Sequence, residues 1–465
     1  MMDVRVAAKW GVVEGSGPLE AGEGEFDADV AVLGGGAAGL MAAIRAAEVG
    51  SRVIVLERNR RAGVKILMSG GTRCNITNAR GLRRMDVVSG PVDPGYDPAQ
   101  CRGTRAIQDA FGPGGPFLGP ALRRFDVDQT VRLFESEGVS TKVEGNGKIF
   151  PASDRATDVL DALSRRLERS GAALRGHASV ESIRPIDGEA GGFRIDLTDA
   201  TIAARRVIVA MGGQSYPGCG TRGDGYRLAA SLGHGLVALR PALVPIRVEP
   251  EWVASLRGLS LQDVVASIHL PGGKLLQERR EAILFAHFGL SGPAILDISR
   301  AVAHHEGVEP LDLRLDLFPD QPREVLDARL QAACRQGKAS VTSLISAMLP
   351  QRLAECLVEA AEIPRTRTGP ELSRAERSRL VQALKGHPLR VAGTLGFEKA
   401  EVTTGGVRLD EVDPRTLQSR LVPGLYFAGE VLDLDGLIGG YNFQAAWSTG
   451  WLAGESAANS QGLRL

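Results

Sequence analysis

The clearest hydrophobic pattern in this chain lies in residues 27–57. A short apolar run at 30–33 is typical of a strand that is buried on both faces, and a second run at 53–56 repeats it. Between the two runs, apolar residues recur at helical spacing until Gly50, a residue type that commonly ends a helix. The pattern therefore predicts a strand, a helix and a second strand, as in a parallel α/β sheet.

After residue 150 the pattern first indicates one helix and then several strands. The helix is expected to be capped by Asp154 and to end at Gly171. Strand-like segments follow at 177–183, 193–198 and 205–213. This small excursion, which returns to an apolar strand ending in two glycines, is common in FAD-binding folds of the glutathione-reductase type.

Two further regions lie between this excursion and the C-terminal segment. Short strand-like runs dominate 241–319, and leucines at helical spacing dominate 321–385. A last strand is expected at 389–396. Within the strand-like region, Gly-Leu-Ser-Gly-Pro predicts a helix start with Ser291 as its N-cap and Pro293 near the first turn.

Three glycines stand where the first strand meets the first helix. Gly34, Gly36 and Gly39 form a GxGxxG pattern, in which the first permits a tight turn and the second a close approach of a pyrophosphate. The helix N-terminus offers unpaired N–H groups to phosphate oxygens. Glu57, at the end of the second strand, is placed to accept hydrogen bonds from ribose hydroxyls. An acid at that place favours an unphosphorylated adenosine ribose, and so predicts FAD or NAD.

The C-terminal segment, 421–454, favours FAD. It has the pattern of a strand, an acidic loop, a glycine turn and a helix, and its strand ends at Gly429 and Glu430. Gly439 and Gly440 precede the expected helix. A helix N-terminus directed at the flavin pyrimidine would stabilise negative charge on reduced flavin.

Composition excludes several classes of protein. A chain of 465 residues exceeds what one core usually supports, so two or three domains are expected. The formal net charge of zero argues against a nucleic-acid partner, and no apolar run reaches the length of a membrane span. Residues 1–26 lack the pattern of a signal peptide and are expected to form a flexible extension. Five scattered cysteines predict no metal site and reduced thiols in a cytoplasmic protein.

The segment 69–78, SGGTRCNITN, has four interpretations: a thiol loop, a metal knuckle, a glycosylation site or a cradle for a large polar ligand. The spacing of metal ligands is absent, Cys74 has no CxxxxC partner, and a cytoplasmic sequon is not glycosylated. The cradle remains, with Cys74 as a small packed residue. Arg73 and Lys65 are expected either to meet a pyrophosphate or anionic substrate or to be structural charges. Asn75 and Asn78 are expected either to bind the flavin edge or to lock the turn.

Seven stretches, spread over nearly the whole chain from Asp27, form a recognisable combination. They are GGGAAGL (34–40), SGGTRCNITN (69–78), KIFPASDRATDV (148–159), VIVAMGGQSYPGCGTRGDGYRLA (207–229), LFAHFGLSGPAIL (284–296), EVTTGGV (401–407) and GLYFAGEVLDLDGLIGGYNFQAAWSTG (424–450). In these stretches the chain resembles the bacterial NAD(P)/FAD-dependent oxidoreductases described as aminoacetone-oxidase-like or BaiN-like flavoproteins. Thr72 stands where such proteins usually have glycine, and Leu437-Ile438 where they often have Pro-Thr. The segment 84–120 and the N-terminal extension also depart from the pattern.

The resemblance implies an α/β fold: a Rossmann-like FAD-binding domain of glutathione-reductase type, with an inserted β-barrel-like domain and a small helical subdomain. The expected boundaries are 1–26 for the extension, 27–240 with 400–465 for the FAD domain, 241–320 with 388–399 for the barrel-like domain, and 321–387 for the helical subdomain.

The residues expected to bind the cofactor all come from the matching stretches or the motifs above. They are Gly34, Gly36, Ala37, Ala38, Gly39, Glu57, Arg58, Lys65, Gly70, Gly71, Arg73, Cys74, Asn75, Asn78, Val180, Gly212, Gly213, Gly429, Glu430, Gly440, Tyr441 and Asn442. The catalytic group is not identified; the candidates are His287, Tyr216 and Tyr441, and for His287 a structural role is the stronger expectation.

The expected activity is flavin-dependent hydride transfer. The electron donor is a small amine or NAD(P)H, which would bind transiently, and the acceptor is O₂ or an unsaturated carbonyl compound. A second GxGxxG, at Gly218, Gly220 and Gly223, lacks a clean preceding strand and is weak evidence for a nicotinamide site. Two alternatives remain: a flavin-dependent RNA-modifying enzyme and a flavoprotein sensor or scaffold without turnover. The oligomeric state is left open.

Overall fold

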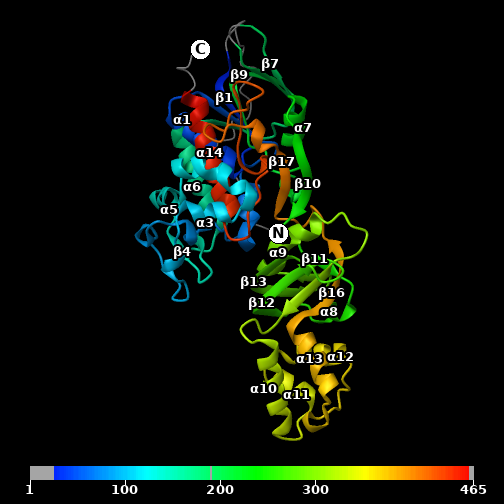
Figure 1. The fold of residues 1–465 in the computed structure, drawn as a ribbon. Helices are drawn as coiled ribbons and strands as arrows, with labels where there is room; N and C mark the ends of the chain where they lie inside the picture. Colours follow the sequence, from blue (N-terminus) through cyan, green and yellow to red (C-terminus); the bar gives the residue numbers. More distant parts are fainter. Residues whose placement is uncertain (1–25, 189–190, 460–465) are drawn as a thin grey trace, which may run out of the picture. The chain divides into compact units, whose positions relative to one another are not determined.

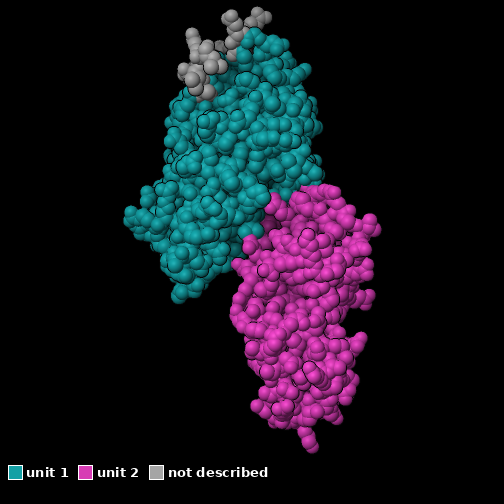
Figure 2. Space-filling model, in the orientation of Figure 1, with its two compact units in different colours: residues 1–239, 402–465 teal, residues 240–401 magenta. Residues whose placement is uncertain are grey.

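The computed structural model describes residues 26–188 and 191–459. The flexible extension predicted at 1–26 therefore lies, except for Phe26, outside the described residues. The chain forms two compact units, residues 1–239 with 402–465 and residues 240–401 (Figures 1 and 2). Each unit has its own hydrophobic core.

The first unit is built on a sheet of seven described strands, in the order β6-β2-β1-β9-β8-β7, with β18 paired to β9. The valine-rich β1 is parallel to β2 and β9, and almost all of it is buried, as expected for a strand covered on both faces. The strands are β1 (Ala28–Leu33), β2 (Val53–Leu56), β6 (Ala173–Arg175), β7 (Val180–Pro185), β8 (Phe193–Leu197), β9 (Thr201–Val209) and β18 (Leu425–Phe427).

Two smaller sheets and eight described α-helices complete this unit. One sheet has the order β3-β5-β4, with β3 (Thr77–Asn78), β4 (Thr141–Val143) and β5 (Lys148–Pro151). The other pairs β10 (Leu236–Ala242) with β17 (Val402–Val407). The helices are α1 (Ala37–Glu48), α2 (Val64–Met68), α3 (Thr104–Asp109), α4 (Gly119–Arg124), α5 (Val127–Ser136), α6 (Ala156–Ser170), α7 (Asp224–Ser231) and α14 (Tyr441–Asn459).

The predicted helix of this unit, α6, ends as expected but begins differently. Gly171 terminates it in the left-handed region, with φ 80°. Its N-cap is Arg155, which makes no side-chain capping bond, so the prediction of Asp154 as the cap was wrong. The Asp154 carboxylate instead pairs with Lys142 and Arg73. The Asp154 carboxylate thus binds two cations, and hydrogen bonds between charged groups are stronger than a neutral capping bond to a backbone N–H.

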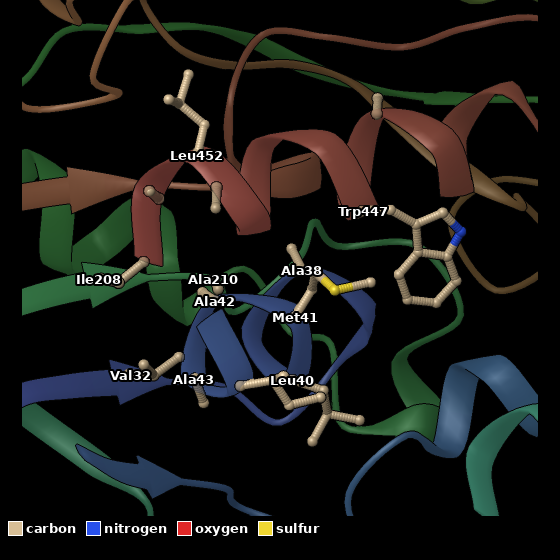
Figure 3. Close-up of a cluster of buried hydrophobic side chains, with 14 of the residues drawn as sticks. Val32, Ala38, Leu40, Met41, Ala42, Ala43, Ile208, Ala210, Trp447 and Leu452 are labelled. Atoms are coloured by element: carbon tan, nitrogen blue, oxygen red, sulfur yellow. The ribbon is translucent and has the colours of Figure 1, made fainter. Parts of the chain in front are cut away.

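Helices α1 and α14 lie side by side in the core (Figure 3). They pack closely because two glycines of α14 face the backbone of α1. A Cβ on Gly450 would lie 2.3 Å from the Ala38 carbonyl oxygen, and one on Gly454 would lie 2.2 Å from that of Ala42. Only glycine at both positions allows this separation. The N-terminal turn of α1 is thereby fixed against the C-terminal segment of the chain.

The second unit contains a closed barrel of strand order β11-β14-β13-β12-β15-β16 and a group of helices. The expected fold class, with its barrel-like insertion and helical part, is therefore confirmed. The strands are β11 (Ile246–Val248), β12 (Ser260–His269), β13 (Leu275–Ala286), β14 (Gly289–Ser291), β15 (Asp312–Asp316) and β16 (His387–Thr394). The helices are α8 (Glu251–Ser255), α9 (Pro293–Ala303), α10 (Arg323–Arg335), α11 (Val341–Ser346), α12 (Gln351–Ala360) and α13 (Arg374–Gly386).

The start of α9 differs from the prediction by one residue. Pro293 is the first helical residue, but the N-cap is Gly292, and Ser291 is the last residue of β14. Gly292 has φ 92°, and a Cβ there would lie 2.9 Å from Leu284 N and from Ile283 Cα, both in β13. The close neighbouring strand requires glycine at the turn, and it leaves Ser291 in the β ladder.

Candidate cofactor-binding site

The turn between β1 and α1 leaves an open space at the helix N-terminus. A Cβ on Gly39 would lie 1.8 Å from the Gly34 carbonyl oxygen, and one on Gly34 would lie 2.7 Å from that of Ala210, so neither position tolerates a side chain. Gly36 is different, since a Cβ there would meet nothing within 4 Å. It is the N-cap of α1, no side chain caps it, and the first turn has no acidic residue. The N–H groups at the start of α1 are suited to bind an anionic group.

Glu57 lies directly after β2 and is almost buried. Its Oε2 accepts a hydrogen bond from Gly35 N at 2.7 Å, and its Oε1 accepts one from Asn59 N at 2.8 Å. The two bonds fix the carboxylate beside the glycine turn, and each oxygen has a lone pair left for a further donor. Arg58 forms an ion pair with Asp224, with Nη1 and Oδ2 2.7 Å apart.

The loop that contains the segment 69–78 has an unusual run of left-handed backbone. Gly70, Gly71, Thr72 and Cys74 all have φ between 55° and 71°. Cys74 is fully buried, and burial raises the pKa of its thiol to about 12. The thiol is therefore protonated at neutral pH, which is consistent with the packing role expected for it and not with a nucleophile.

The two asparagines of this loop bind backbone groups at the start of α14. Asn78 Nδ2 donates to the Gly439 carbonyl oxygen at 2.9 Å. With its amide oriented so that oxygen and nitrogen each meet a suitable partner, Asn75 accepts from Gly440 N at 2.9 Å and donates to the Thr77 carbonyl oxygen at 2.9 Å. A Cβ on Gly440 would lie 2.5 Å from that same Thr77 oxygen, so glycine is required there. In this arrangement both amides bind backbone groups of the turn; a contact of either one with the flavin edge stays a prediction.

The two cationic candidates, Arg73 and Lys65, have different surroundings. Arg73 donates to Glu144 at 2.6 Å and to Asp154 at 3.4 Å, and its guanidinium lies 4.0 Å from the centre of the Phe150 ring. These contacts neutralise and fix Arg73 beside β5. Lys65 belongs instead to a separate polar network around Glu430.

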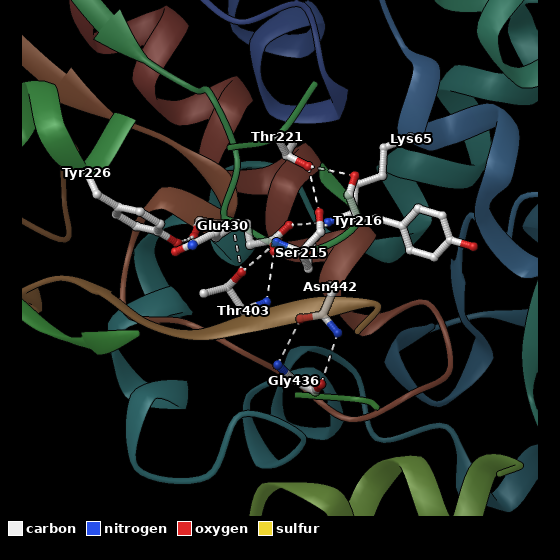
Figure 4. A network of polar contacts seen from close by, with 10 residues as sticks. Lys65, Ser215, Tyr216, Thr221, Tyr226, Thr403, Glu430, Gly436 and Asn442 are labelled. Carbon is white, nitrogen blue, oxygen red and sulfur yellow. Dashed lines mark hydrogen bonds and ion pairs between the residues drawn. The ribbon is translucent and has the colours of Figure 1, made fainter. Parts of the chain in front are cut away.

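Glu430 is the centre of that network (Figure 4). Its Oε2 accepts from Lys65 Nζ at 2.7 Å, and its Oε1 accepts from Thr403 N at 2.9 Å and from Ser215 Oγ at 3.0 Å. Ser215 Oγ also accepts from Lys65 Nζ at 2.9 Å. A Cβ on Gly213 would lie 2.5 Å from both Glu430 Oε1 and Thr403 Oγ1, so glycine makes room for the carboxylate.

Two residues of this network, Ser215 and Thr403, were not among the predicted site residues. Thr403 Oγ1 accepts from Gln214 N at 2.8 Å and from Ser215 N at 3.1 Å, which fixes the loop after β9. One feature of the sequence could have indicated Thr403: two threonines, Thr403 and Thr404, lie inside a strand that is otherwise apolar and glycine-rich. Both are buried in β17.

Tyr226 also binds this network, through the backbone of Glu430. Burial raises the pKa of Tyr226, and its protonated hydroxyl donates to the Glu430 carbonyl oxygen.

The remaining candidates are placed as follows. Tyr216 follows Ser215 in the left-handed region, with φ 56°, and its ring is directed away from the network in Figure 4. Tyr441 is buried at the start of α14. Val180 is buried at the start of β7. His287 lies in the second unit, against Phe288. The predicted cofactor residues all belong to the first unit.

The described residues contain neither a metal site nor a membrane-spanning helix. No described group of three His, Cys, Asp or Glu side chains is arranged to hold a metal ion. No helix in the described ranges is both long enough and apolar enough to span a membrane.

The sequence matches the family described as HI0933-like protein Rossmann domain over residues 28–88 and 99–456. A Clostridium scindens protein named 3-dehydro-bile acid delta(4,6)-reductase is 34% identical over 437 residues, covering 92% of this chain and 98% of that relative. An Escherichia coli protein named ribosomal RNA dihydrouridine synthase is 33% identical over 424 residues, covering 91% and 96%.

Among solved structures, the chain is similar to a 3-ketosteroid-delta4-(5alpha)-dehydrogenase from Rhodococcus jostii RHA1 in complex with 4-androstene-3,17-dione. The TM-score is 0.52 and the identity 18%, covering 94% of this chain and 98% of that one. At this identity the likeness concerns the fold.

Proposed function

This chain belongs to the HI0933-like Rossmann family of FAD-dependent oxidoreductases, and from that premise we propose that it reduces a carbon–carbon double bond conjugated to a carbonyl group. The substrate is a small organic molecule, and the electrons come from NAD(P)H. The observation that carries the proposal is the 34% identity, over almost the whole of both chains, to a protein named as a delta(4,6)-reductase of 3-dehydro-bile acids.

The residues of the first unit fit FAD. Gly36 and the open N-terminus of α1 would hold the pyrophosphate, and Glu57 the adenosine ribose. Residues 426–430 resemble the second FAD motif of such enzymes, in which an acid binds the ribityl chain, and Glu430 would take that role here. The glycine turn bound by Asn75 and Asn78 would direct the start of α14 at the flavin. Bound FAD supplies the hydride chemistry, and the protein supplies binding and orientation.

Reduction is favoured over amine oxidation because of the chemistry in the relatives' names. A 3-dehydro, delta(4,6) compound has double bonds conjugated to a ring ketone, and dihydrouridine differs from uridine by two hydrogens across a bond next to a ring carbonyl. Both names therefore denote saturation of an electron-poor double bond. Such a bond accepts hydride at one carbon and a proton at the other.

The test is anaerobic mixing of the oxidised, FAD-loaded protein with NADH, with NADPH and, in separate samples, with a panel of small amines. Protein reduced in this way is then mixed with a panel of cyclic enones. The expected result is bleaching of the flavin by one of the two nucleotides and reoxidation by an enone. Bleaching by amines, with no reoxidation by any enone, would contradict the proposal. Bleaching by neither nucleotide nor amine would favour the sensor alternative.

A second candidate substrate is a uracil ring in RNA, which the name of the Escherichia coli relative suggests. The bond to be reduced has the same electronic character. The balance of charges, 55 Lys and Arg against 55 Asp and Glu, gives the chain no overall attraction for RNA. Adding ribosomal RNA fragments to the reoxidation assay distinguishes the two substrates, because only one of them would reoxidise reduced flavin.

A further inference from the structure

Lys65 donates hydrogen bonds to Glu430 and Ser215, which places it in the network around Glu430. We propose that Lys65 and Glu430 together bind neighbouring hydroxyl groups of the ribityl chain, with Lys65 as the donor and Glu430 as the acceptor. The proposal rests on the binding of FAD by this chain. It goes beyond a role for the acid alone and replaces the expectation that Lys65 meets a pyrophosphate or an anionic substrate.

Lys65 and Glu430 each keep one hydrogen-bonding position open for a ligand. Glu430 Oε1 already accepts from Thr403 N and Ser215 Oγ, so it has little capacity for a ligand. Oε2 accepts from Lys65 alone among the described residues, and keeps one lone pair. The Lys65 ammonium has three N–H groups, of which Glu430 and Ser215 take two. One acceptor and one donor are thus left, on atoms 2.7 Å apart.

The charge of the pair also favours a neutral ligand. The Lys65–Glu430 pair is neutral as a whole, so it exerts little attraction on a pyrophosphate, which carries negative charge. A polyol chain is neutral, and each of its hydroxyls both donates and accepts. Neighbouring hydroxyls therefore match an adjacent ammonium and carboxylate better than an anion does.

The Lys65–Glu430 pair is held in place and is only partly exposed. The Lys65 side chain is 30% exposed and that of Glu430 is 19% exposed. Thr403, on β17, and Ser215, on the loop after β9, both bind the carboxylate, and Gly213 leaves it room. A fixed donor and acceptor lose little conformational entropy when a ligand binds.

The test measures the affinity of the apoprotein for four ligands: riboflavin, FMN, FAD and ADP. Riboflavin has the ribityl chain without phosphate, and ADP has the pyrophosphate without the ribityl chain. For Lys65→Met, loss of a charged donor is expected to weaken riboflavin, FMN and FAD alike, by roughly 10- to 100-fold, and to leave ADP within about twofold. Lys65→Arg, which keeps a charged donor, should retain more flavin affinity than Lys65→Met.

The control is Lys142→Met, which removes a lysine paired with Asp154 in the β4–β5 sheet of the same unit. It should leave all four affinities unchanged. A parallel loss of ADP and FAD affinity in Lys65→Met, with riboflavin unaffected, would place Lys65 at the pyrophosphate and overturn the proposal. Unchanged flavin affinities would also overturn it.

Intact ADP binding shows that the variant is folded. If Lys65→Met does not fold, the same four measurements on Lys65→Gln decide. Glutamine loses the charge but keeps a neutral donor, so the three flavin affinities should again fall while ADP affinity is kept, and the fall should be smaller than that expected for Lys65→Met. Since no substrate or NAD(P)H is present, the result is independent of whether the chain reduces conjugated double bonds.

Discussion

Thr72 has a backbone φ of 71°, in a loop where Gly70 and Gly71 also adopt the left-handed region. A β-branched residue is strained there, at a cost of about 1–2 kcal/mol. The Thr72 hydroxyl donates to the Gly71 carbonyl oxygen at 2.6 Å, which offsets part of the cost. The resemblance to other flavoproteins predicts glycine at this position, and the geometry gives the physical reason for that preference.

Thr72→Gly is therefore expected to stabilise the loop by removing the strain. Part of this gain is offset, by about 0.4–1 kcal/mol, because glycine has more conformational freedom in the unfolded chain. Thr72→Ala keeps the strain and loses the hydroxyl. We expect the glycine variant to exceed the alanine variant by about 1 kcal/mol in resistance of the 69–78 loop to opening, measured by native-state hydrogen exchange. Equal protection in the two variants would show that the loop carries no strain at Thr72.

At the scale of elements, the contact between α1 and α14 matters most for the site. Gly450 and Gly454 recur at a spacing of four and place one stripe of small residues against Ala38 and Ala42. The sequence contained this signal, but the prediction used the C-terminal segment for its flavin motif and not for its packing. The consequence is that the N-terminal turn of α1 depends on Gly450, more than 400 positions away. The last turn of α1 is also held by α14, through the Arg45–Glu455 ion pair, whose residues are 410 positions apart.

Gly454→Ala is expected to separate the two helices, because its Cβ would lie 2.2 Å from a backbone oxygen. Overpacking of this kind typically costs about 1–3 kcal/mol, and the measurement is thermal unfolding with FAD present and absent. Gly337→Ala is the matched control, since a Cβ there meets nothing within 4 Å and should change stability by less than about 0.5 kcal/mol. A Gly454 variant as stable as this control would contradict the close packing.

At the scale of the whole molecule, the sequence predicts those parts of the fold whose structure is determined by residues close together in the chain. The β1–α1–β2 unit follows from local apolar runs and glycines, and the barrel and helical part follow from strand and helix patterns joined to the resemblance. The network around Glu430 could not be predicted in the same way. Ser215 and Thr403 are 188 residues apart and meet only after β17 and the loop after β9 are in place. Asp154 and Ser291 were misplaced for the same reason, because partners from other elements decide their roles.

The predicted cofactor residues all lie in the first unit, so FAD should stabilise that unit selectively. A ligand at 100 times its Kd adds about 2.7 kcal/mol to the stability of the state that binds it. Hydrogen exchange of the apoprotein and the FAD-loaded protein is the measurement. Protection should rise in β1, α1, the 69–78 loop and α14, and should stay unchanged in barrel strands such as β12 and β15. A comparable rise in the barrel strands would show that residues 240–401 also respond to the cofactor, and would require a binding contribution from the second unit.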